Sequence, residues 1–175
     1  MKTKKPLTTL KISFFSTQVY DRTFFEKYNV EFGNQLEFFD TQLNMQTVKL
    51  INDTTVVCVF VNDIVDAEVI AELARKKVKI IALRCAGFNN VDLDAAKKHN
   101  IRVCRVPAYS PQAVAEHAMA MILTLNRKTH KAYNRVREQN FALNGLLGFD
   151  LFGKTIGIIG TGNIGKAFAK IAKGF

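Results

Sequence analysis

Apolar and polar positions along the first 106 residues fall into two alternating kinds of segment. Five short apolar runs have the length and composition of strands, at residues 11–16, 36–40, 56–61, 79–84 and 101–106. Residues 66–77 and 92–99 instead have helical character, and an alternation of strand, helix and strand predicts a mostly parallel sheet with helices on both faces. We therefore expect one α/β domain from about Leu10 to Val106.

The segment 66–77 is the clearest helical pattern. Val69, Ile70, Leu73 and Ala74 share one face of a helix with 3.6 residues per turn. Asp66 precedes them, and its carboxylate can accept a hydrogen bond from a free backbone N–H of the first turn.

The organisation changes at Pro107. Ser110 is suited to cap a helix, with Pro111 at the first helical position, where its missing N–H costs nothing. Residues 112–139 then form either one long helix or two helices broken near Asn126. A single helix of that length would extend beyond a small sheet and pack on a second subunit or a neighbouring domain.

A glycine-rich motif near the end of the chain carries the clearest chemistry. The apolar residues 155–159 predict a strand, and the motif Gly160-x-Gly162-x-x-Gly165 leads from it into a helical segment. In dinucleotide-binding units the first glycine allows a tight turn, the second lets the backbone approach a pyrophosphate, and the third lets helix and strand pack closely. The alternative is a glycine turn without a ligand, but the flanking strand and helix patterns favour nucleotide binding.

Composition and cysteine content predict a soluble, cytoplasmic protein. Of the 175 residues, 48% are hydrophobic and 23% charged, and no apolar run approaches the ~18 residues that a membrane helix needs. The basic N-terminus has only a short apolar patch after it, which is not typical of a secretory signal. Cys58, Cys85 and Cys104 lack the spacing of metal ligands, so we expect buried thiols in a reducing compartment and no metal.

The net charge of +10 does not by itself indicate a nucleic-acid partner. Lysines and arginines are spread along the chain with acidic residues between them, and no nucleic-acid-binding motif is present. Solvated surfaces explain this distribution, so neither a nucleic acid nor a membrane is expected as a partner.

Four motifs in order resemble the D-isomer-specific 2-hydroxyacid dehydrogenases, and among these most of all the D-lactate dehydrogenases. They are Arg-Cys-Ala-Gly-Phe-Asn-Asn-Val-Asp at 84–92, Val-Pro-Ala-Tyr-Ser-Pro at 106–111, Ala-Glu-His-Ala at 115–118 and the glycine motif at 156–165. The resemblance implies a flavodoxin-like substrate domain at residues 1–107. It implies the beginning of a Rossmann domain that binds NAD at residues 108–175, with the substrate in the cleft between the domains.

Carried over by position, the resemblance implies two sets of binding residues. The substrate, a small 2-oxo or 2-hydroxy acid, would meet the backbone amides of Ala86 and Gly87, with Tyr109 beside it and Phe60 in the pocket wall. The structural alternatives are that Gly87 is a turn glycine and Tyr109 a hinge residue. NAD would be bound by the residues Gly160, Gly162, Asn163, Ile164 and Gly165 at its pyrophosphate and by Val114 at its nicotinamide.

The resemblance assigns no catalytic residue to this chain. The arginine, glutamate and histidine of the family's hydride transfer follow the glycine motif, so we expect residues 1–175 alone to be inactive. Glu116 and His117 are adjacent on a helix and point in different directions, which favours a role at the domain interface over an acid/base pair.

Two functions remain open at this stage. One is an NAD-dependent D-lactate dehydrogenase or a related D-2-hydroxyacid dehydrogenase, homodimeric when intact, of which this chain is the N-terminal part. The other is a non-catalytic product of the same fold, either a truncated gene or an interaction protein resembling the corepressors of this fold.

Overall fold

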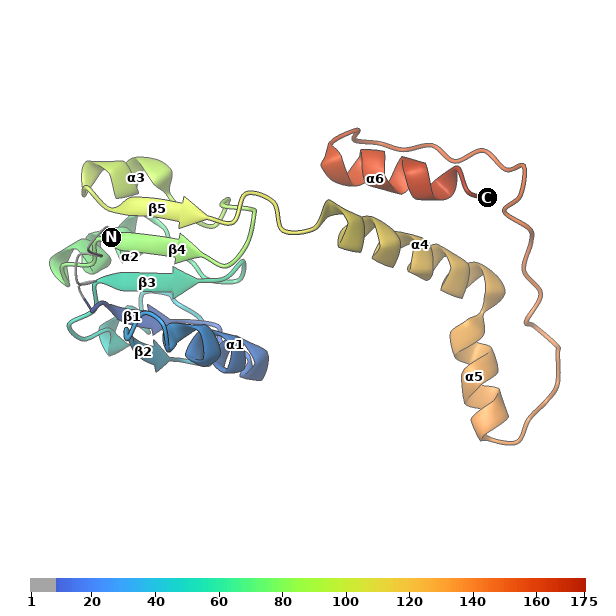
Figure 1. Ribbon diagram of the computed structural model, residues 1–175, viewed down its shortest axis with the longest axis horizontal. Helices are drawn as coiled ribbons and strands as arrows, with labels where there is room; N and C mark the ends of the chain where they lie inside the picture. Colours follow the sequence, from blue (N-terminus) through green and yellow to red (C-terminus); the bar gives the residue numbers. More distant parts are fainter. Residues whose placement is uncertain (1–8) are drawn as a thin grey trace, which may run out of the picture. The chain divides into compact units, whose positions relative to one another are not determined.

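The computed structural model describes residues 9–175, which divide into two compact units with the boundary between Pro107 and Ala108. Figure 1 shows the two units and the order of their elements. The basic residues Lys2, Lys4 and Lys5, considered above for a targeting signal, lie outside the described residues.

The first unit contains a parallel five-stranded sheet. Its strands are β1 (Lys11–Phe14), β2 (Gln35–Phe38), β3 (Val56–Val59), β4 (Ile80–Leu83) and β5 (Arg102–Arg105). They lie in the order β2-β1-β3-β4-β5, and every neighbouring pair is parallel. This is the flavodoxin-like order, so the predicted fold class of this region is confirmed.

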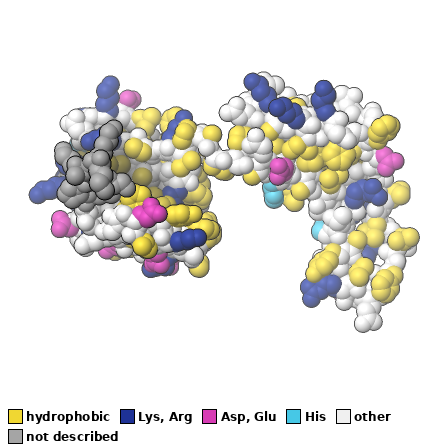
Figure 2. Space-filling model, in the orientation of Figure 1, with side chains coloured by type: hydrophobic (Ala, Val, Ile, Leu, Met, Phe, Trp, Pro, Cys, Tyr) yellow, Lys and Arg dark blue, Asp and Glu magenta, His cyan; other side chains and the backbone are white. Residues whose placement is uncertain are grey.

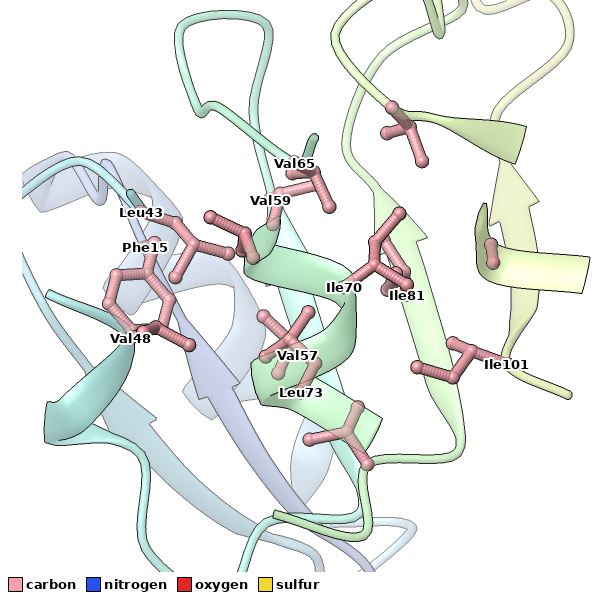
Figure 3. Packing of buried hydrophobic residues seen from close by; sticks show 14 of the residues in the cluster. Phe15, Leu43, Val48, Val57, Val59, Val65, Ile70, Leu73, Ile81 and Ile101 are labelled. Carbon is pink, nitrogen blue, oxygen red and sulfur yellow. The ribbon is translucent and has the colours of Figure 1, made fainter. Parts of the chain in front are cut away.

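One face of the sheet carries the core. Alternate strand residues, including Val57 and Ile81, pack against the helices α2 (Ala67–Arg75) and α3 (Leu93–Lys98) and the short 3-10 helix η1 (Val48–Leu50). Figure 3 shows Ile70 and Leu73 of α2 among these strand residues. Each such buried side chain contributes about 1.5–3 kcal/mol relative to exposure.

Both helices of this face begin as their sequences indicate. The carboxylate of Asp66 accepts a hydrogen bond from Val69 N, and that of Asp92 accepts one from Ala95 N. The capping role predicted for Asp66 is therefore confirmed, and α2 buries Val69, Ile70 and Leu73.

The opposite face is covered by α1 (Val19–Asn29), which lies in front of β1 and β2 in Figure 1. The ring of Phe25 in α1 lies 4.5 Å from that of Phe14. The sequence pattern did not predict this helix, because no residue of α1 is buried and its apolar periodicity is weak.

Cys104 is exposed, and the expectation that all three cysteines are buried was wrong for it. Phe14, Cys58, Ala82 and Cys104 stand side by side on the neighbouring strands β1, β3, β4 and β5. Their side chains therefore point to the same face of the sheet. Cys104 therefore lies on the face that α1 covers at Phe14, but on the edge strand β5, away from α1. Cys58 and Cys85 are buried, as expected.

The second unit contains three helices, α4 (Pro111–Arg127), α5 (Thr129–Arg137) and α6 (Asn163–Ala172). Ser110 Oγ accepts from Ala113 N and caps α4, with Pro111 at its first position. Lys128 has a left-handed backbone, with φ of 51°, and separates α4 from α5. The two-helix alternative is thus correct, and α4 packs along α6.

Residues 155–159 form no strand, contrary to the sequence prediction. A parallel strand needs a neighbour to pair with its backbone N–H and C=O groups, and residues 108–175 contain no other strand. This segment also does not pair with β1, in agreement with the prediction that the glycine motif and residues 11–16 belong to different units. No helix within residues 9–175 is long and apolar enough to cross a membrane.

Candidate functional site

Three residues of the expected substrate site meet at one edge of the sheet in the first unit. Phe60 directly follows β3, while Ala86 and Gly87 follow β4. β3 and β4 are parallel neighbours, so these residues lie at the same carboxyl edge. In open α/β sheets this edge is where ligands bind.

The Ala86–Gly87 segment presents backbone N–H groups. The carbonyl of Ala86 accepts a hydrogen bond from Arg105 Nη1 at 2.7 Å, and that of Gly87 accepts one from Cys85 Sγ at 3.2 Å. The amides of Ala86 and Gly87 donate to no group within residues 9–175. Two neighbouring amides of this kind can bind an anion such as a carboxylate.

Gly87 is not explained by the needs of a turn. Its φ is not in the left-handed region, and a Cβ built on it would meet no atom within 4 Å. Neither backbone conformation nor crowding therefore requires glycine at this position, whereas close approach of a ligand to the amide would favour it.

Phe60 is held by polar groups that the sequence analysis did not identify. Its N–H donates to Asp63 Oδ2 at 2.6 Å, and its carbonyl accepts from Asn90 Nδ2 at 2.9 Å. The guanidinium carbon of Arg84 lies 5.5 Å from the centre of its ring. Arg84 and Asn90 lie in the motif at 84–92, which did not reveal this role, and the sequence signal for Asp63 is only that it is a polar residue soon after a strand.

Arg84 is a buried cation at the same edge. Its Nη2 donates to the carbonyls of Phe15 at 3.0 Å and Ser16 at 3.1 Å. Its Nε lies 3.4 Å from Asp21 Oδ1, and the two side chains are only 9% and 12% exposed. Arg84 therefore joins the ends of β1 and β4 to the start of α1.

Burial disfavours the thiolate form of both Cys58 and Cys85. Burial raises the pKa of Cys58 to about 11, although the nearby Arg84 charge opposes the rise. Burial likewise raises the pKa of the Cys85 thiol above its ordinary value. Neither residue is poised to act as a thiolate nucleophile near neutral pH.

A polar depression of about 470 Å³ adjoins Phe60. Besides Phe60 it is lined by Tyr20 of α1 and by residues from the loops after β1, β2 and β3, namely Ser16, Gln18, Asp40, Gln42 and Asn62. Phe60 thus forms one wall of an open hollow at the carboxyl edge of the sheet.

The glycine motif of the second unit has a distinct physical reason for each glycine. Gly160 has φ of +94°, a conformation that other residues rarely adopt. A Cβ on Gly162 would meet no atom within 4 Å, whereas a Cβ on Gly165 would collide with the carbonyl oxygen of Gly160. These are the roles of turn, open approach and close packing that a dinucleotide-binding motif requires.

The start of α6 is suited to a phosphate. Gly162 is its cap residue and provides no side-chain hydrogen bond, in contrast to Asp66, Asp92 and Ser110 at other helices. The first amides of a helix have no partner within the helix, and the positive end of its dipole favours an anion. Asn163 and Ile164 are the first two residues of this helix, and both are exposed.

The other expected contacts also belong to the second unit. Tyr109 is 68% exposed and precedes the cap of α4, and Val114 lies in the first turns of α4 and is 38% exposed. A hollow of about 360 Å³ between α4 and α6 is lined by Asn163 and by residues of both helices, but not by Val114.

Glu116 and His117 are both exposed on α4. No hydrogen bond or ion pair joins them in the part of the chain that the structure describes. They offer no acid/base pair, and their role at a domain interface stays a prediction. Figure 2 shows Lys and Arg side chains at separate places on both units, with apolar and acidic side chains between them.

Comparisons with known proteins agree with this geometry. Residues 12–146 match the family model "D-isomer specific 2-hydroxyacid dehydrogenase, catalytic domain", and residues 119–175 match the model "D-isomer specific 2-hydroxyacid dehydrogenase, NAD binding domain".

Individual relatives give the same result. The chain is 55% identical to a "2-hydroxyacid dehydrogenase homolog" of Haemophilus influenzae and 54% identical to D-lactate dehydrogenase of Escherichia coli, in each case over 95% of this chain and 50% of the relative. The chain thus spans about half the length of these curated relatives.

Solved structures are similar as well. The apo structure of the Escherichia coli D-lactate dehydrogenase matches with a TM-score of 0.88 and 54% identity, covering 94% of this chain and 52% of that one. A D-lactate dehydrogenase of Aquifex aeolicus complexed with NAD and lactic acid matches with a TM-score of 0.75 and 32% identity, covering 93% of this chain and 48% of that one.

Proposed function

Since the chain belongs to the D-isomer specific 2-hydroxyacid dehydrogenases, we propose that it is the N-terminal part of an NAD-dependent D-lactate dehydrogenase. The reaction is reversible hydride transfer between the nicotinamide and C2 of pyruvate, which gives D-lactate. The observation that carries the proposal is the 54% identity to the Escherichia coli enzyme over 95% of this chain, together with a carboxyl edge that presents two amides beside Phe60.

The first unit supplies the substrate domain. We assign the substrate carboxylate to the amides of Ala86 and Gly87, because neither N–H donates to a group of the described residues and a Cβ built on Gly87 would meet no atom within 4 Å. Phe60 forms the wall beside the small methyl group of pyruvate, and Tyr109 is proposed as a further substrate contact. An apolar wall and a pair of fixed donors are what a short 2-oxo acid requires.

The second unit supplies the beginning of the NAD site. Gly160, Gly162 and Gly165 shape the turn, the amides of Asn163 and Ile164 receive the pyrophosphate at the start of α6, and Val114 packs on the nicotinamide. The bound nicotinamide supplies the hydride. The arginine, glutamate and histidine of the reaction lie outside these residues, so we assign no catalytic residue within 1–175.

The intact protein is proposed to be a cytoplasmic homodimer. The buried, protonated thiols Cys58 and Cys85 are compatible with a reducing compartment.

The test uses the reading frame that continues past the codon for Phe175. We expect this frame to encode the arginine, glutamate and histidine, and the purified product to oxidise NADH with pyruvate and to form D-lactate. A product that folds and binds NADH but forms no lactate, or forms the L-isomer, would refute the proposal. A frame that lacks these three residues would favour the non-catalytic alternative.

A further inference from the structure

The side chain of Asn90, in the loop that follows β4, donates to two backbone carbonyls of the loop that follows β3. The side chain of Asp63 joins that same loop to the loops that follow β1 and β2. We infer that Asp63 and Asn90 are positioning residues, which fix Phe60 in register with the carboxylate-binding amides of Ala86 and Gly87. This inference rests on the substrate site described under the proposed function. Neither residue is expected to touch the substrate.

The carboxylate of Asp63 is hydrogen-bonded to residues of three loops. Its side chain is buried, with the residue only 1% exposed. Oδ1 accepts from Ser16 Oγ and from Leu43 N, both at 2.7 Å, and Oδ2 accepts from Phe60 N at 2.6 Å. One residue from each of the loops after β1, β2 and β3 is therefore bonded to the same carboxylate.

Asp63 forms no direct ion pair within residues 9–175. Its direct hydrogen-bond donors are all neutral groups, namely Ser16 Oγ, Leu43 N and Phe60 N. Burying a carboxylate is costly unless hydrogen bonds satisfy it, and here the donors include the backbone of the proposed pocket wall. The Asp63 carboxylate thus fixes the backbone of Phe60 through the hydrogen bond from Phe60 N–H.

Asn90 connects this group to the loop after β4. Its Nδ2 donates to the carbonyls of Phe60 at 2.9 Å and of Asp63 at 3.0 Å, and its own carbonyl accepts from Val65 N at 3.0 Å. Both backbone polar groups of Phe60 are consequently held, one by Asp63 and the other by Asn90. Asn90 lies three residues after Gly87 on one continuous loop, so a shift of either loop changes the distance between Phe60 and the amides.

Replacing Asp63 by asparagine, which has the same shape, distinguishes a positioning role of the side chain from an effect of its charge on substrate binding. In Asp63→Asn, an NH₂ group replaces one of the two oxygens and therefore faces either the N–H of Phe60 or the N–H of Leu43. Two donors cannot form a hydrogen bond with each other, so one of these hydrogen bonds is lost. The change also removes a negative charge near a site for an anion. A purely electrostatic role predicts a lower KM for pyruvate, whereas a positioning role predicts a higher one.

The experiment uses the full-length protein that contains this chain. We compare Asp63→Asn and Asn90→Leu with Asp66→Asn, which removes the same charge three residues away and leaves an amide that also caps α2. For the first two variants we expect KM for pyruvate to rise about tenfold or more while KM for NADH stays within about twofold. For Asp66→Asn we expect wild-type values.

An unchanged or lower KM for pyruvate in folded Asp63→Asn and Asn90→Leu would overturn the inference, as would an equal loss of affinity for NADH. If Asp63→Asn does not fold, Asn90→Leu alone decides. If the wild type shows no turnover of pyruvate, the proposed function has failed. Hydrogen exchange of the Phe60 amide in Asn90→Leu then tests whether Asn90 helps to hold Phe60 in place. Asn90 does not bond to this N–H, so faster exchange supports the positioning role, and unchanged exchange refutes it.

Discussion

The backbone carbonyl of Gly160 lies against the position that a Cβ would occupy on Gly165. The turn before α6 and the first turn of α6 are therefore in contact through backbone alone. Gly162, between them, borders open space and has an ordinary φ of −69°. Substitutions at these positions should consequently have different effects.

Replacing Gly162 by valine should weaken cofactor binding more than folding. The added side chain meets no protein atom but occupies the path by which a pyrophosphate would reach the backbone. In the full-length protein we expect NADH affinity to fall about tenfold or more, which corresponds to about 1.4 kcal/mol, with a smaller change in unfolding free energy. Gly165→Val is the control, and it should lose stability first. Unchanged NADH affinity in folded Gly162→Val would contradict the prediction.

Removing the buried charge of Arg84 should destabilise the first unit. Arg84→Met leaves Asp21 without its cation and the carbonyls of Phe15 and Ser16 without a donor. Breaking a buried pair from one side costs about 3–5 kcal/mol, which urea unfolding would measure. Arg75→Met is the matched control, since the Arg75 side chain is 73% exposed, and it should change stability by less than about 0.5 kcal/mol. Equal stability of the two variants would exclude this role of Arg84.

The cysteines should differ in reactivity. Cys104 is exposed on the edge strand, while Cys58 is buried with its pKa raised to about 11. At pH 8, a thiol reagent should label Cys104 first and Cys58 only when the unit opens. Mass spectrometry of the native chain and of Cys104→Ser identifies the labelled site. Rapid labelling of Cys58 in Cys104→Ser would show that its burial is wrong.

The Cys58 thiol should also make stability depend on pH at the alkaline end. Burial raises its pKa from 9.0 to about 11, so the folded state keeps a proton that the unfolded state has lost between these values. Its contribution is fully present below pH 9 and is lost as pH rises to about 11, by roughly 2–3 kcal/mol. Urea unfolding of the wild type and of Cys58→Val, from pH 8 to 11, isolates this contribution. Parallel curves would contradict it.

The fold of the first unit could be predicted because its strands are short apolar runs and its helices start at capping residues. Val57 and Ile81 lie in such runs, and Asp66 precedes its helix where a cap must stand. The helix α1 could not be predicted in this way, because it buries no residue and owes its place to contacts such as Phe25 with Phe14.

The candidate site also contains residues that the sequence could indicate and residues that it could not. The glycine motif was recognisable because its spacing follows an apolar run and leads into a helical pattern, whereas Gly87 was assigned only through the family resemblance. Asp63 and Asn90 were not recognisable, since a polar residue after a strand does not reveal which backbone groups it will bond to once three loops meet. The strand expected at residues 155–159 failed for the complementary reason, because its apolar pattern specifies a strand only where a neighbouring strand exists.

The 175 residues produced alone should show no dehydrogenase activity and should be least stable after about Leu147. In the second unit only Ala115 and Met119 are buried, while Ile159 is fully exposed and Ile156 is 48% exposed. Each large apolar side chain left in water forgoes about 1.5–3 kcal/mol, which is a large part of a domain stability of ~5–15 kcal/mol. Hydrogen exchange should therefore be fast across residues 155–171 and slow in the core strands, such as at Val57. Strong protection of residues 155–171 in a monomer, or turnover of pyruvate by this chain, would show that the second unit is complete as it stands.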